Sequence, residues 1–343
     1  MPRGELRLFA CRAGRHFGER VADELLSSGC SKRGLEVYSF KEFECGENKQ
    51  HGILESVRGA DVYLFQSGSR DLKSGTSVDD QLMELYRFAN GMENANAGSI
   101  TAIFPYLPYS RQDKIWERGE PYSAVLTAAL LKTSGVNRVI TADLHADQIR
   151  GFYSALKMHM EPIHASYVFL DELRKFYSKR LNDFVFASTD AGGGERAKHY
   201  QKKVPGSGLA FGSKIKSYTA VGKVVEKVDV VGDVSGRDVM IVEDMIDTGG
   251  SLLRTAEIAK KKGAKSIVIV AAHGLFSGGA ERKLGRAHSD GLIERIWCTD
   301  SVFHSRDFLH NNSFINEVSL APLFSQVIQK LHHGDGVSEV YRD

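Results

Sequence analysis

The chain has little cysteine, and what it has is widely spread. Cys11, Cys30, Cys45 and Cys298 form no C-x-x-C pair. Neither a zinc site nor a disulfide framework is therefore indicated. We expect free thiols and a reducing compartment, which is the cytoplasm.

Long apolar runs are also missing. No stretch of about 18 consecutive apolar residues occurs, so the sequence predicts no transmembrane helix. The first ten residues, MPRGELRLFA, carry charges where a signal peptide would need its apolar core. We expect a cytoplasmic protein with no membrane partner.

A charge excess of one sign is absent as well. The 45 Lys and Arg residues are nearly balanced by 43 Asp and Glu residues. Bulk charge therefore gives no reason to expect a nucleic acid or an anionic membrane as partner. Any phosphate chemistry must rest on local clusters.

The 343 residues are too many for one average domain of about 100 to 200 residues, which suggests two. Short buried-strand candidates alternate with helical periodicity in both halves, and no linker separates them. This alternation predicts parallel sheets with crossover helices. Strands are expected at 6–10, 35–40, 61–66, 99–104, 138–142, 184–188, 239–242, 266–273, 293–299 and 315–318. Helices are expected at 18–28, 78–92, 123–133, 168–176, 252–262 and 320–331, and a polar loop at 43–51.

The most informative stretch is 237–253, RDVMIVEDMIDTGGSLL. Its β-branched run at 239–242 predicts a parallel strand buried on both faces. Glu243 and Asp244 then lie at the carboxyl end, where open α/β sheets bind ligands. Two adjacent carboxylates are suited to accept hydrogen bonds from vicinal hydroxyls, such as those of a ribose.

Small residues follow these acids and lead into the helix expected at 252–262. Gly249 and Gly250 let the main chain approach a ligand closely, while Thr248 and Ser251 add hydroxyl donors. The free N–H groups of such a helix start can bind a phosphate. From the glycines alone, an ordinary capped strand-turn-helix remains an equal alternative.

Two further strands are each followed by acids. Asp143, His145 and Asp147 alternate after the strand at 138–142, and Asp190 follows the strand at 184–188. Such side chains bind a divalent cation or a water in its shell. A glycine-rich turn, 191–194, comes next and is suited to a second phosphate group.

Two loops contribute positive charge. Arg111 and Gln112, in the proline-containing segment 105–114, are suited to phosphate oxygens and to the edge of a base. Lys214 and Lys216 lie in 209–230, which has no clear periodicity and is interpreted as a mobile basic flap. The alternative for 105–114 is a solvated loop, and the alternative for 209–230 is an exposed hairpin.

Taken jointly, these landmarks resemble the ribose-phosphate pyrophosphokinase family, also called phosphoribosyl pyrophosphate (PRPP) synthetases, over nearly the whole chain. The matching strings are ESVRG at 55–59, 105–114, DLHADQ at 143–148, DAGG at 190–193, 243–251 and HGLFSG at 273–278. Phosphoribosyltransferases share only the string at 243–251.

The resemblance implies transfer of the β,γ-diphosphoryl group of ATP to the C1 hydroxyl of ribose 5-phosphate, which yields PRPP and AMP and requires Mg²⁺. It also implies two similar phosphoribosyltransferase-like α/β domains, each a mostly parallel sheet flanked by helices. The ATP-side domain is expected at 1–163, completed by the C-terminal helix 320–343. The ribose-5-phosphate side is expected at 164–319. A homo-oligomer, a hexamer in the family, is implied as well.

The resemblance also assigns site residues. The ATP-binding residues are Phe43, Cys45, Gly46, Glu47, Arg111 and Gln112. The ribose-5-phosphate-binding residues are Glu243, Asp244, Asp247, Thr248, Gly249, Gly250 and Ser251. The metal-binding residues are His145 and Asp190, and the catalytic flap residues are Lys214 and Lys216.

Some positions depart from the family pattern. Glu243 stands where Asp is usual, Lys216 where Arg is usual, and Cys45 where Asp or Asn is usual. A catalytically weak, regulatory PRPP synthetase-associated subunit is therefore the alternative. Such subunits tend to lose metal or flap residues, whereas His145 and Lys214 are present here.

Overall fold

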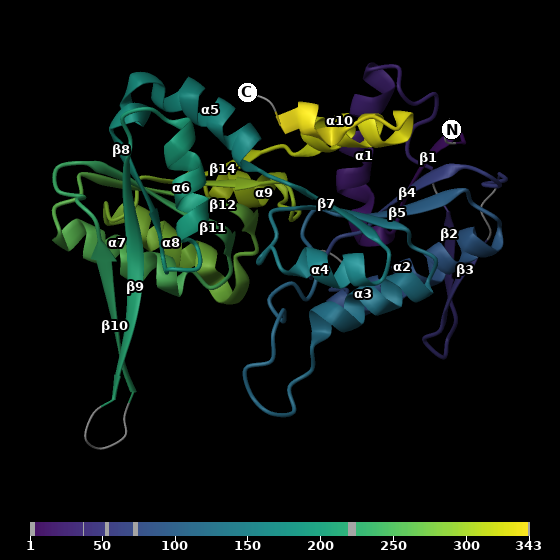
Figure 1. Cartoon of the computed structure of the whole chain (residues 1–343), viewed down its shortest axis with the longest axis horizontal. Helices are drawn as coiled ribbons and strands as arrows, with labels where there is room; N and C mark the ends of the chain where they lie inside the picture. The colour runs from purple at the N-terminus through teal and green to yellow at the C-terminus, as the bar shows by residue number, and fades with distance from the viewer. Residues whose placement is uncertain (1–3, 37, 52–54, 71–74, 219–223, 342–343) are drawn as a thin grey trace. The chain divides into compact units, whose positions relative to one another are not determined.

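The computed structural model describes residues 4–36, 38–51, 55–70, 75–218 and 224–341 (Figure 1). The chain divides into two compact units. Unit 1 consists of Met1–His164, Ser301–Phe303 and Leu320–Asp343. Unit 2 consists of Ala165–Asp300 and His304–Ser319.

Unit 1 is built on a five-stranded, wholly parallel sheet in the order β1-β4-β5-β6-β7. Its strands are β1 (Leu6–Ala10), β4 (Asp61–Phe65), β5 (Ser99–Phe104), β6 (Arg138–Ala142) and β7 (His159–Ile163). Beyond the outer edge of β1, Glu36 forms a parallel bridge with Phe9. The backbone N–H of Glu36 donates to the carbonyl oxygen of Leu8 at 2.8 Å.

Helices cover both faces of this sheet, as Figure 1 shows. Residues of α2 (Val78–Asn94), α3 (Ser123–Thr133) and α4 (Ile149–Ala155) share one core with Val62 and Leu64 of β4. The next residue, Phe65, points to the opposite face, because side chains alternate along a strand. There it meets Phe17 of α1 (Arg15–Ser27), with ring centroids 6.3 Å apart.

The C-terminal helix α10 (Ala321–His333) belongs to this second face of unit 1. The ring of Phe324 packs edge-on against Phe17 at 5.0 Å. Near the end of the helix, Nδ1 of His332 lies 2.9 Å from Oδ2 of the buried Asp61. The 3₁₀ helix η4 (Val337–Tyr341) follows.

The expected polar loop at 43–51 is instead part of a hairpin. Strands β2 (Ser39–Glu42) and β3 (Asn48–His51) pair antiparallel. Gly46 takes a φ of +86° in the turn, and its N–H donates to the carbonyl oxygen of Phe43 at 2.8 Å. The prediction failed because the polar strands of this separate two-stranded sheet carry no apolar alternation.

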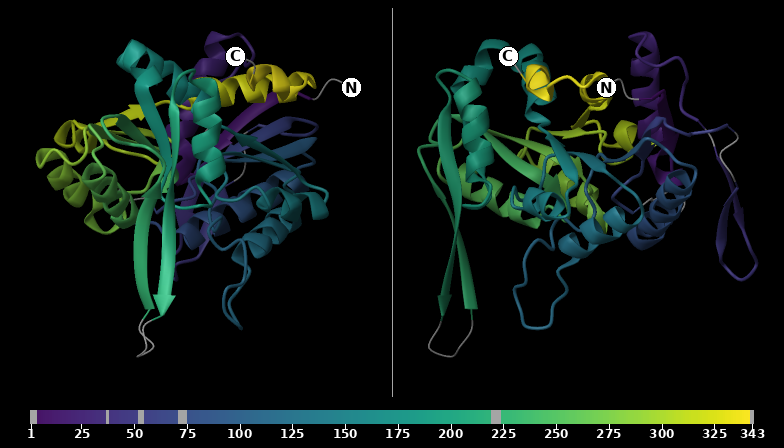
Figure 2. Two further views of the ribbon diagram at one scale, coloured as in Figure 1. Left: turned by 60° about the vertical axis from the view of Figure 1, so that its left-hand side comes forward. Right: turned by 45° about the vertical axis from the view of Figure 1, so that its right-hand side comes forward.

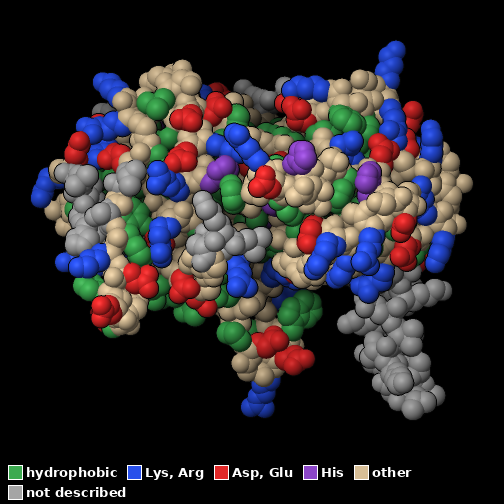
Figure 3. Space-filling model, turned by 180° about the vertical axis from the view of Figure 1, so that it is seen from behind, with side chains coloured by type: hydrophobic (Ala, Val, Ile, Leu, Met, Phe, Trp, Pro, Cys, Tyr) green, Lys and Arg blue, Asp and Glu red, His purple; other side chains and the backbone are tan. Residues whose placement is uncertain are grey.

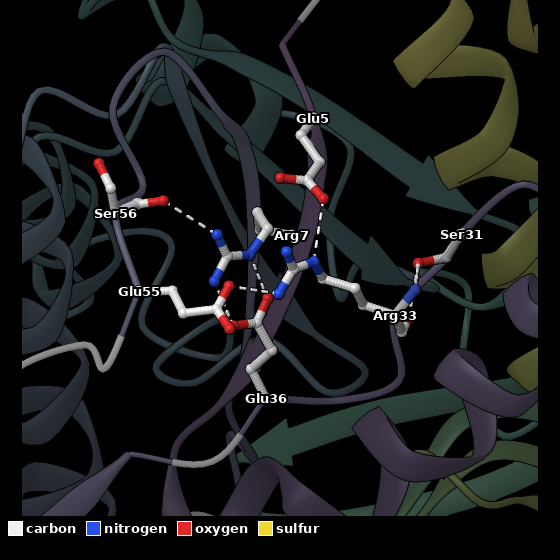
Figure 4. A network of polar contacts seen from close by, with 7 residues as sticks. All are labelled: Glu5, Arg7, Ser31, Arg33, Glu36, Glu55 and Ser56. Carbon is white, nitrogen blue, oxygen red and sulfur yellow. Dashed lines mark hydrogen bonds and ion pairs between the residues drawn. The ribbon is translucent and has the colours of Figure 1, made fainter.

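A buried arginine fixes the start of β1 and the segment that follows the hairpin (Figure 4). Arg7, only 1% exposed, makes two hydrogen bonds to the carboxylate of Glu36. Its Nη1 donates to the backbone oxygen of Ser56 at 2.9 Å. Arg33 joins Glu5 and Glu55 alongside, so the matched string at 55–59 is tied to the edge of the sheet.

Unit 2 contains a seven-stranded sheet in the order β10-β9-β8-β11-β12-β13-β14. Only β9 and β10 pair antiparallel; the other neighbours are parallel. The strands are β8 (Phe184–Ser188), β9 (Gly208–Tyr218), β10 (Val224–Val231), β11 (Asp238–Ile246), β12 (Ser266–Gly274), β13 (Arg295–Thr299) and β14 (Ile315–Val318). The two predicted parallel α/β sheets are thus confirmed.

The alternation along β8 explains why helices cover both faces of this sheet. Val185 and Ala187 enter a core that includes α7 (Gly250–Lys261) and α8 (Ala280–Ser289). Phe184 and Phe186 point the other way, toward rings on α5 (Ser166–Tyr177) and α6 (Gly194–Lys203). Among the described residues of the unit, the remaining α-helix is α9 (Arg306–Asn311).

The segment expected to be a flap forms the β9–β10 hairpin. In its register the backbone of Lys214 pairs with Val228, and that of Lys216 with Glu226. Figure 2 shows the two strands extending well beyond the helices of unit 2. The residues of the hairpin at 219–223 lie outside the described part of the chain.

Charges of both signs are mixed on one face of the molecule. On the face drawn in Figure 3, Lys and Arg side chains are interspersed with Asp and Glu. This mixture matches the small net charge of the sequence. Among the described residues, no helix is both long and apolar enough to cross a membrane.

Arg180, in the 3₁₀ helix η2 (Ser178–Asp183), joins the amino ends of the strands of unit 2. It donates to Asp238 of β11 at 2.7 Å, to Ser266 of β12 at 2.9 Å and to Glu294, before β13, at 2.7 Å. Burial alone would raise the pKa of Asp238, but hydrogen bonds from Arg180 and Ser266 lower it overall.

We predict that Arg180→Gln lowers the free energy of unfolding by about 2 kcal/mol, because it leaves the buried Asp238 carboxylate without its cation. Urea denaturation measures the change. The difference in unfolding free energy between parent and variant should shrink as the pH falls through the aspartate pKa range, because Arg180 stabilises only the ionised form of Asp238. Arg282→Gln, at an exposed pair with Glu281, is the control. Equal destabilisation by both substitutions would contradict the prediction.

Candidate functional site

The two acids of the central stretch lie within β11 and not after its end. The sequence predicts a strand at 239–242, whereas β11 continues to Ile246. On one side the pairing with β8 stops at Ile241, and on the other the pairing with β12 continues to Ile246. β11 continues past the expected end because the long apolar strand β12 goes on pairing with it. Beyond Ile241, β11 no longer has β8 beside it but the turn that follows β8. Glu243 and Asp244 lie next to this turn.

Glu243 is held by that turn. Its Oε1 accepts a hydrogen bond from the backbone N–H of Thr189 at 2.7 Å. Its Oε2 lies 3.7 Å from Nη1 of Arg196, on α6. Burial raises the pKa of Glu243, although Thr189 and Arg196 oppose the shift.

Asp244 shares the same cation. Its Oδ1 lies 3.9 Å from Nη1 of Arg196, and its side chain is buried. One guanidinium therefore offsets the repulsion between two adjacent carboxylates. Sequence reasoning did not foresee Thr189, because its contact with Glu243 spans 54 positions and uses a backbone donor.

The predicted phosphate loop has the conformation that a helix-start site needs. Gly249, the residue before α7, takes a φ of +73°, which favours glycine. The first bond of the helix runs from the N–H of Leu253 to the carbonyl oxygen of Gly249 at 3.0 Å. The N–H groups of Gly250, Ser251 and Leu252 precede that bond. Thr248 and Gly250 are exposed, while Asp247 and Ser251 are half-buried.

The turn after β8 is more self-contained than expected. The N–H of Gly193 donates to Oδ1 of Asp190 at 3.0 Å, and that of Gly194 donates to the carbonyl oxygen of Ala191 at 3.2 Å. Two of the backbone donors predicted for a second phosphate are therefore engaged within the turn. Asp190 itself remains half-buried at its edge.

In unit 1, the acids after β6 have a partner that the sequence did not reveal. Oδ1 of Asp143 lies 3.5 Å from Nδ1 of His164, and this contact raises the pKa of His164. His145 and Asp147 are exposed. Within the described ranges, no group of three His, Cys, Asp or Glu side chains is arranged to hold a metal ion.

Arg111 and Gln112 are exposed on a loop that is anchored around them. The backbone oxygen of Gln112 accepts from the N–H of Ala124 at 3.2 Å. The buried Asp113 accepts from Nε2 of Gln148 at 2.6 Å. That bond joins two of the matched strings, 105–114 and 143–148, and so fixes the loop relative to the end of β6.

The other predicted ATP-binding residues share one turn. Phe43, Cys45, Gly46 and Glu47 connect β2 to β3 and are all exposed. Nζ of Lys41 lies 5.5 Å from the centroid of the Phe43 ring. The hairpin thus presents an aromatic ring and a carboxylate together.

Comparison with known proteins decides the family. The N-terminal domain of ribose phosphate pyrophosphokinase matches residues 6–135, and the phosphoribosyl synthetase-associated domain matches 195–342. Ribose-phosphate pyrophosphokinase of Wolinella succinogenes is 34% identical over 335 residues, 98% of each chain. The chain belongs to the ribose-phosphate pyrophosphokinase family.

Other members agree with that assignment. The ribose-phosphate pyrophosphokinase of Vibrio cholerae is 32% identical over 338 residues, which cover 98% of this chain and 99% of the relative. The crystal structure of phosphoribosylpyrophosphate synthetase from Mycobacterium smegmatis superposes with a TM-score of 0.82 and 30% identity. The match covers 96% of this chain and 99% of the Mycobacterium smegmatis chain. The predicted family and fold class are confirmed.

We predict that Gly212→Ala in β9 disturbs the turn that holds Glu243. A Cβ at Gly212 would lie 2.2 Å from the carbonyl oxygen of Thr189, so the backbone must move. The expected loss is about 1–3 kcal/mol of unfolding free energy, measured by chemical denaturation. Gly151→Ala on α4, where a Cβ meets nothing within 4 Å, should cost nothing. A Gly212→Ala protein as stable as the parent would refute the contact.

Proposed function

We propose that this chain is a catalytically active ribose-phosphate pyrophosphokinase. It transfers the β,γ-diphosphoryl group of ATP to the C1 hydroxyl of ribose 5-phosphate and forms PRPP and AMP. The observation that carries the proposal is the match to ribose-phosphate pyrophosphokinases over 98% of the chain, together with the acids and the phosphate loop at one end of β11 and α7.

Ribose 5-phosphate binds along the end of β11. Glu243 and Asp244 accept hydrogen bonds from the ribose hydroxyls, and the Arg196 guanidinium lies 3.7 and 3.9 Å from their carboxylates and offsets part of their negative charge. The 5-phosphate lies against the N–H groups at the start of α7, where the helix dipole favours an anion. Asp247, Thr248, Gly249, Gly250 and Ser251 form this loop.

ATP binds to unit 1. The exposed guanidinium of Arg111 is suited to phosphate oxygens, and Gln112 to the edge of the adenine. The hairpin turn supplies a stacking ring in Phe43, with Cys45, Gly46 and Glu47 beside it. The ATP-side domain is 1–163 with 320–343, and the ribose-5-phosphate domain is 164–319.

Mg²⁺ is the metal that suits these residues best. His145 and Asp190 supply one imidazole and one carboxylate, fewer donors than a closed protein site requires. Mg²⁺ normally keeps several waters and takes the remaining ligands from substrate phosphates. A bound ion would neutralise charge on the transferred group, and Asp190, whose carboxylate accepts a hydrogen bond from the N–H of Gly193, would help to hold it.

Lys214 and Lys216 are the proposed catalytic cations. Diphosphoryl transfer needs little covalent help but strong neutralisation of charge, which basic side chains on a closing hairpin provide. Closure also excludes water, which would otherwise compete with the sugar hydroxyl. We further propose a cytoplasmic homo-oligomer, by analogy a hexamer.

The alternative, a weakly active PRPP synthetase-associated subunit, is not favoured. The relatives that match nearly the full length are named as pyrophosphokinases. The departures at Glu243, Cys45 and Lys216 keep, respectively, a carboxylate, a small side chain and a cation.

The decisive assay incubates the purified protein with ATP, Mg²⁺ and ribose 5-phosphate and follows AMP and PRPP together. Both products should form in equal amounts, and Lys214→Ala should lower kcat at least 100-fold, or about 2.7 kcal/mol, with the KM for ATP nearly unchanged. Lys198→Ala, an exposed lysine on α6 paired with Glu195, should retain parental kcat. Absence of PRPP from the parent protein would overturn the proposed function.

We predict that Gly250→Ala weakens the binding of ribose 5-phosphate and leaves the stability of the fold unchanged. A Cβ at Gly250 meets nothing within 4 Å, so the unfolding free energy should be unchanged. In the complex the same methyl group lies at the N–H groups that face the phosphate, so the KM for ribose 5-phosphate should rise at least tenfold, or about 1.4 kcal/mol. Steady-state kinetics and denaturation are measured on one preparation. Normal kinetics would remove this loop from the phosphate site.

A further inference from the structure

In unit 1 the direction in which the chain adds successive strands to the sheet reverses between β1 and β4. From β1 the chain passes through α1 to Glu36, which bridges the outer edge of β1. It then returns to the other edge of β1 as β4 and continues through β5, β6 and β7. In open α/β sheets, ligands bind outside the carboxyl ends of the strands at such a reversal.

A pocket of about 370 Å³ lies at this position. Its walls come from the turn after β1 with the start of α1, from the loop after β4, and from Val302 and Phe303. Arg12, Arg15 and Arg70 line it, and Glu19 is the single carboxylate among the lining residues. None of the residues proposed for ATP or ribose 5-phosphate belongs to it.

Arg12 is oriented in advance. Its backbone N–H and its Nε both donate to the carboxylate of Glu84, at 3.1 and 3.3 Å. The Glu84 side chain is 1% exposed, and the guanidinium carbon of Arg12 lies 3.8 Å from the centroid of the Phe40 ring. The two terminal nitrogens of Arg12 make no hydrogen bond within the described part of the chain. They are therefore available for a bidentate contact.

The other two arginines can adapt to a ligand. Nε of Arg15 lies 2.8 Å from Oε1 of Glu19, in an exposed pair that contributes little to stability. Arg70 is exposed and has no ion pair among the residues described. Both side chains can turn toward an anion at small cost.

The serine side of the pocket is rigid. Nε2 of the buried Gln66 donates to the backbone oxygen of Gln81, and Nε2 of Gln81 donates to that of Ser69, both at 2.8 Å. A Cβ at Gly68 would lie 1.8 Å from the carbonyl oxygen of Tyr106, so only glycine allows this close approach. The loop thus holds Ser67 and Ser69 at the pocket wall.

We propose that this pocket binds a small molecule that carries a phosphate or diphosphate group, at a site separate from the two proposed substrate sites. Guanidinium groups and serine hydroxyls are the donors that recognise phosphate oxygens, and α1 begins beside them with the positive end of its dipole. The volume lies within the range of small-molecule sites, about 300–1,000 Å³.

Isothermal titration with inorganic pyrophosphate, without divalent cations and with ribose 5-phosphate at saturation, tests the proposal. The parent protein should bind at least one more equivalent per chain than R15Q/R70Q, which removes two exposed guanidinium groups. The variant R282Q/R286Q on α8 removes the same charge elsewhere and should match the parent. Equal stoichiometry and affinity, within twofold, for the parent and R15Q/R70Q would overturn the proposal.

A single substitution serves as the control in case the double variant R15Q/R70Q does not fold. R70Q alone should weaken the additional binding at least threefold while its urea midpoint stays at the parental value. Unchanged binding by folded R70Q and R15Q/R70Q would refute the site. Repeating the titration with inorganic phosphate identifies which form is recognised: comparable affinity supports a single phosphate group, and weaker binding supports a diphosphate.

Discussion

The buried contact among Glu243, Thr189 and Arg196 is the interaction on which the site in unit 2 depends. It joins β11, the turn after β8 and the first turns of α6 at one end of the sheet. Because a buried carboxylate is costly unless it is paired and hydrogen-bonded, the contact also fixes the positions of its partners. The acids proposed to meet a sugar are thereby held in place before any ligand arrives.

Backbone constraints complement this polar contact. Gly212 lets β9 approach the carbonyl of Thr189, and Gly249 supplies the left-handed turn that starts α7. In unit 1, Gly68 plays the same part for the loop after β4. The loops at the carboxyl ends of both sheets are thus shaped by close packing of main chain against main chain. Side chains such as Arg12 are then oriented by that framework.

The sequence predicted α3 and β14 with the bounds that the structure shows, and it predicted the family from its polar strings. It did not predict the extension of β11, because that length is set by pairing with β12. It did not predict the β2–β3 hairpin, because Phe40 is the single apolar residue in the sequences of the two strands. Contacts such as Arg12 with Glu84, 72 positions apart, follow from the tertiary fold and leave no local signal.

The position of α10 has a consequence for biosynthesis. The helix covers one face of unit 1 through contacts such as Phe324 with Phe17, yet it is translated after all of unit 2. On the ribosome, unit 2 can therefore reach its native state while the part of the apolar face of unit 1 that α10 covers is still exposed. Nascent chains arrested before residue 321 would carry that exposed face, which makes them natural clients for chaperones.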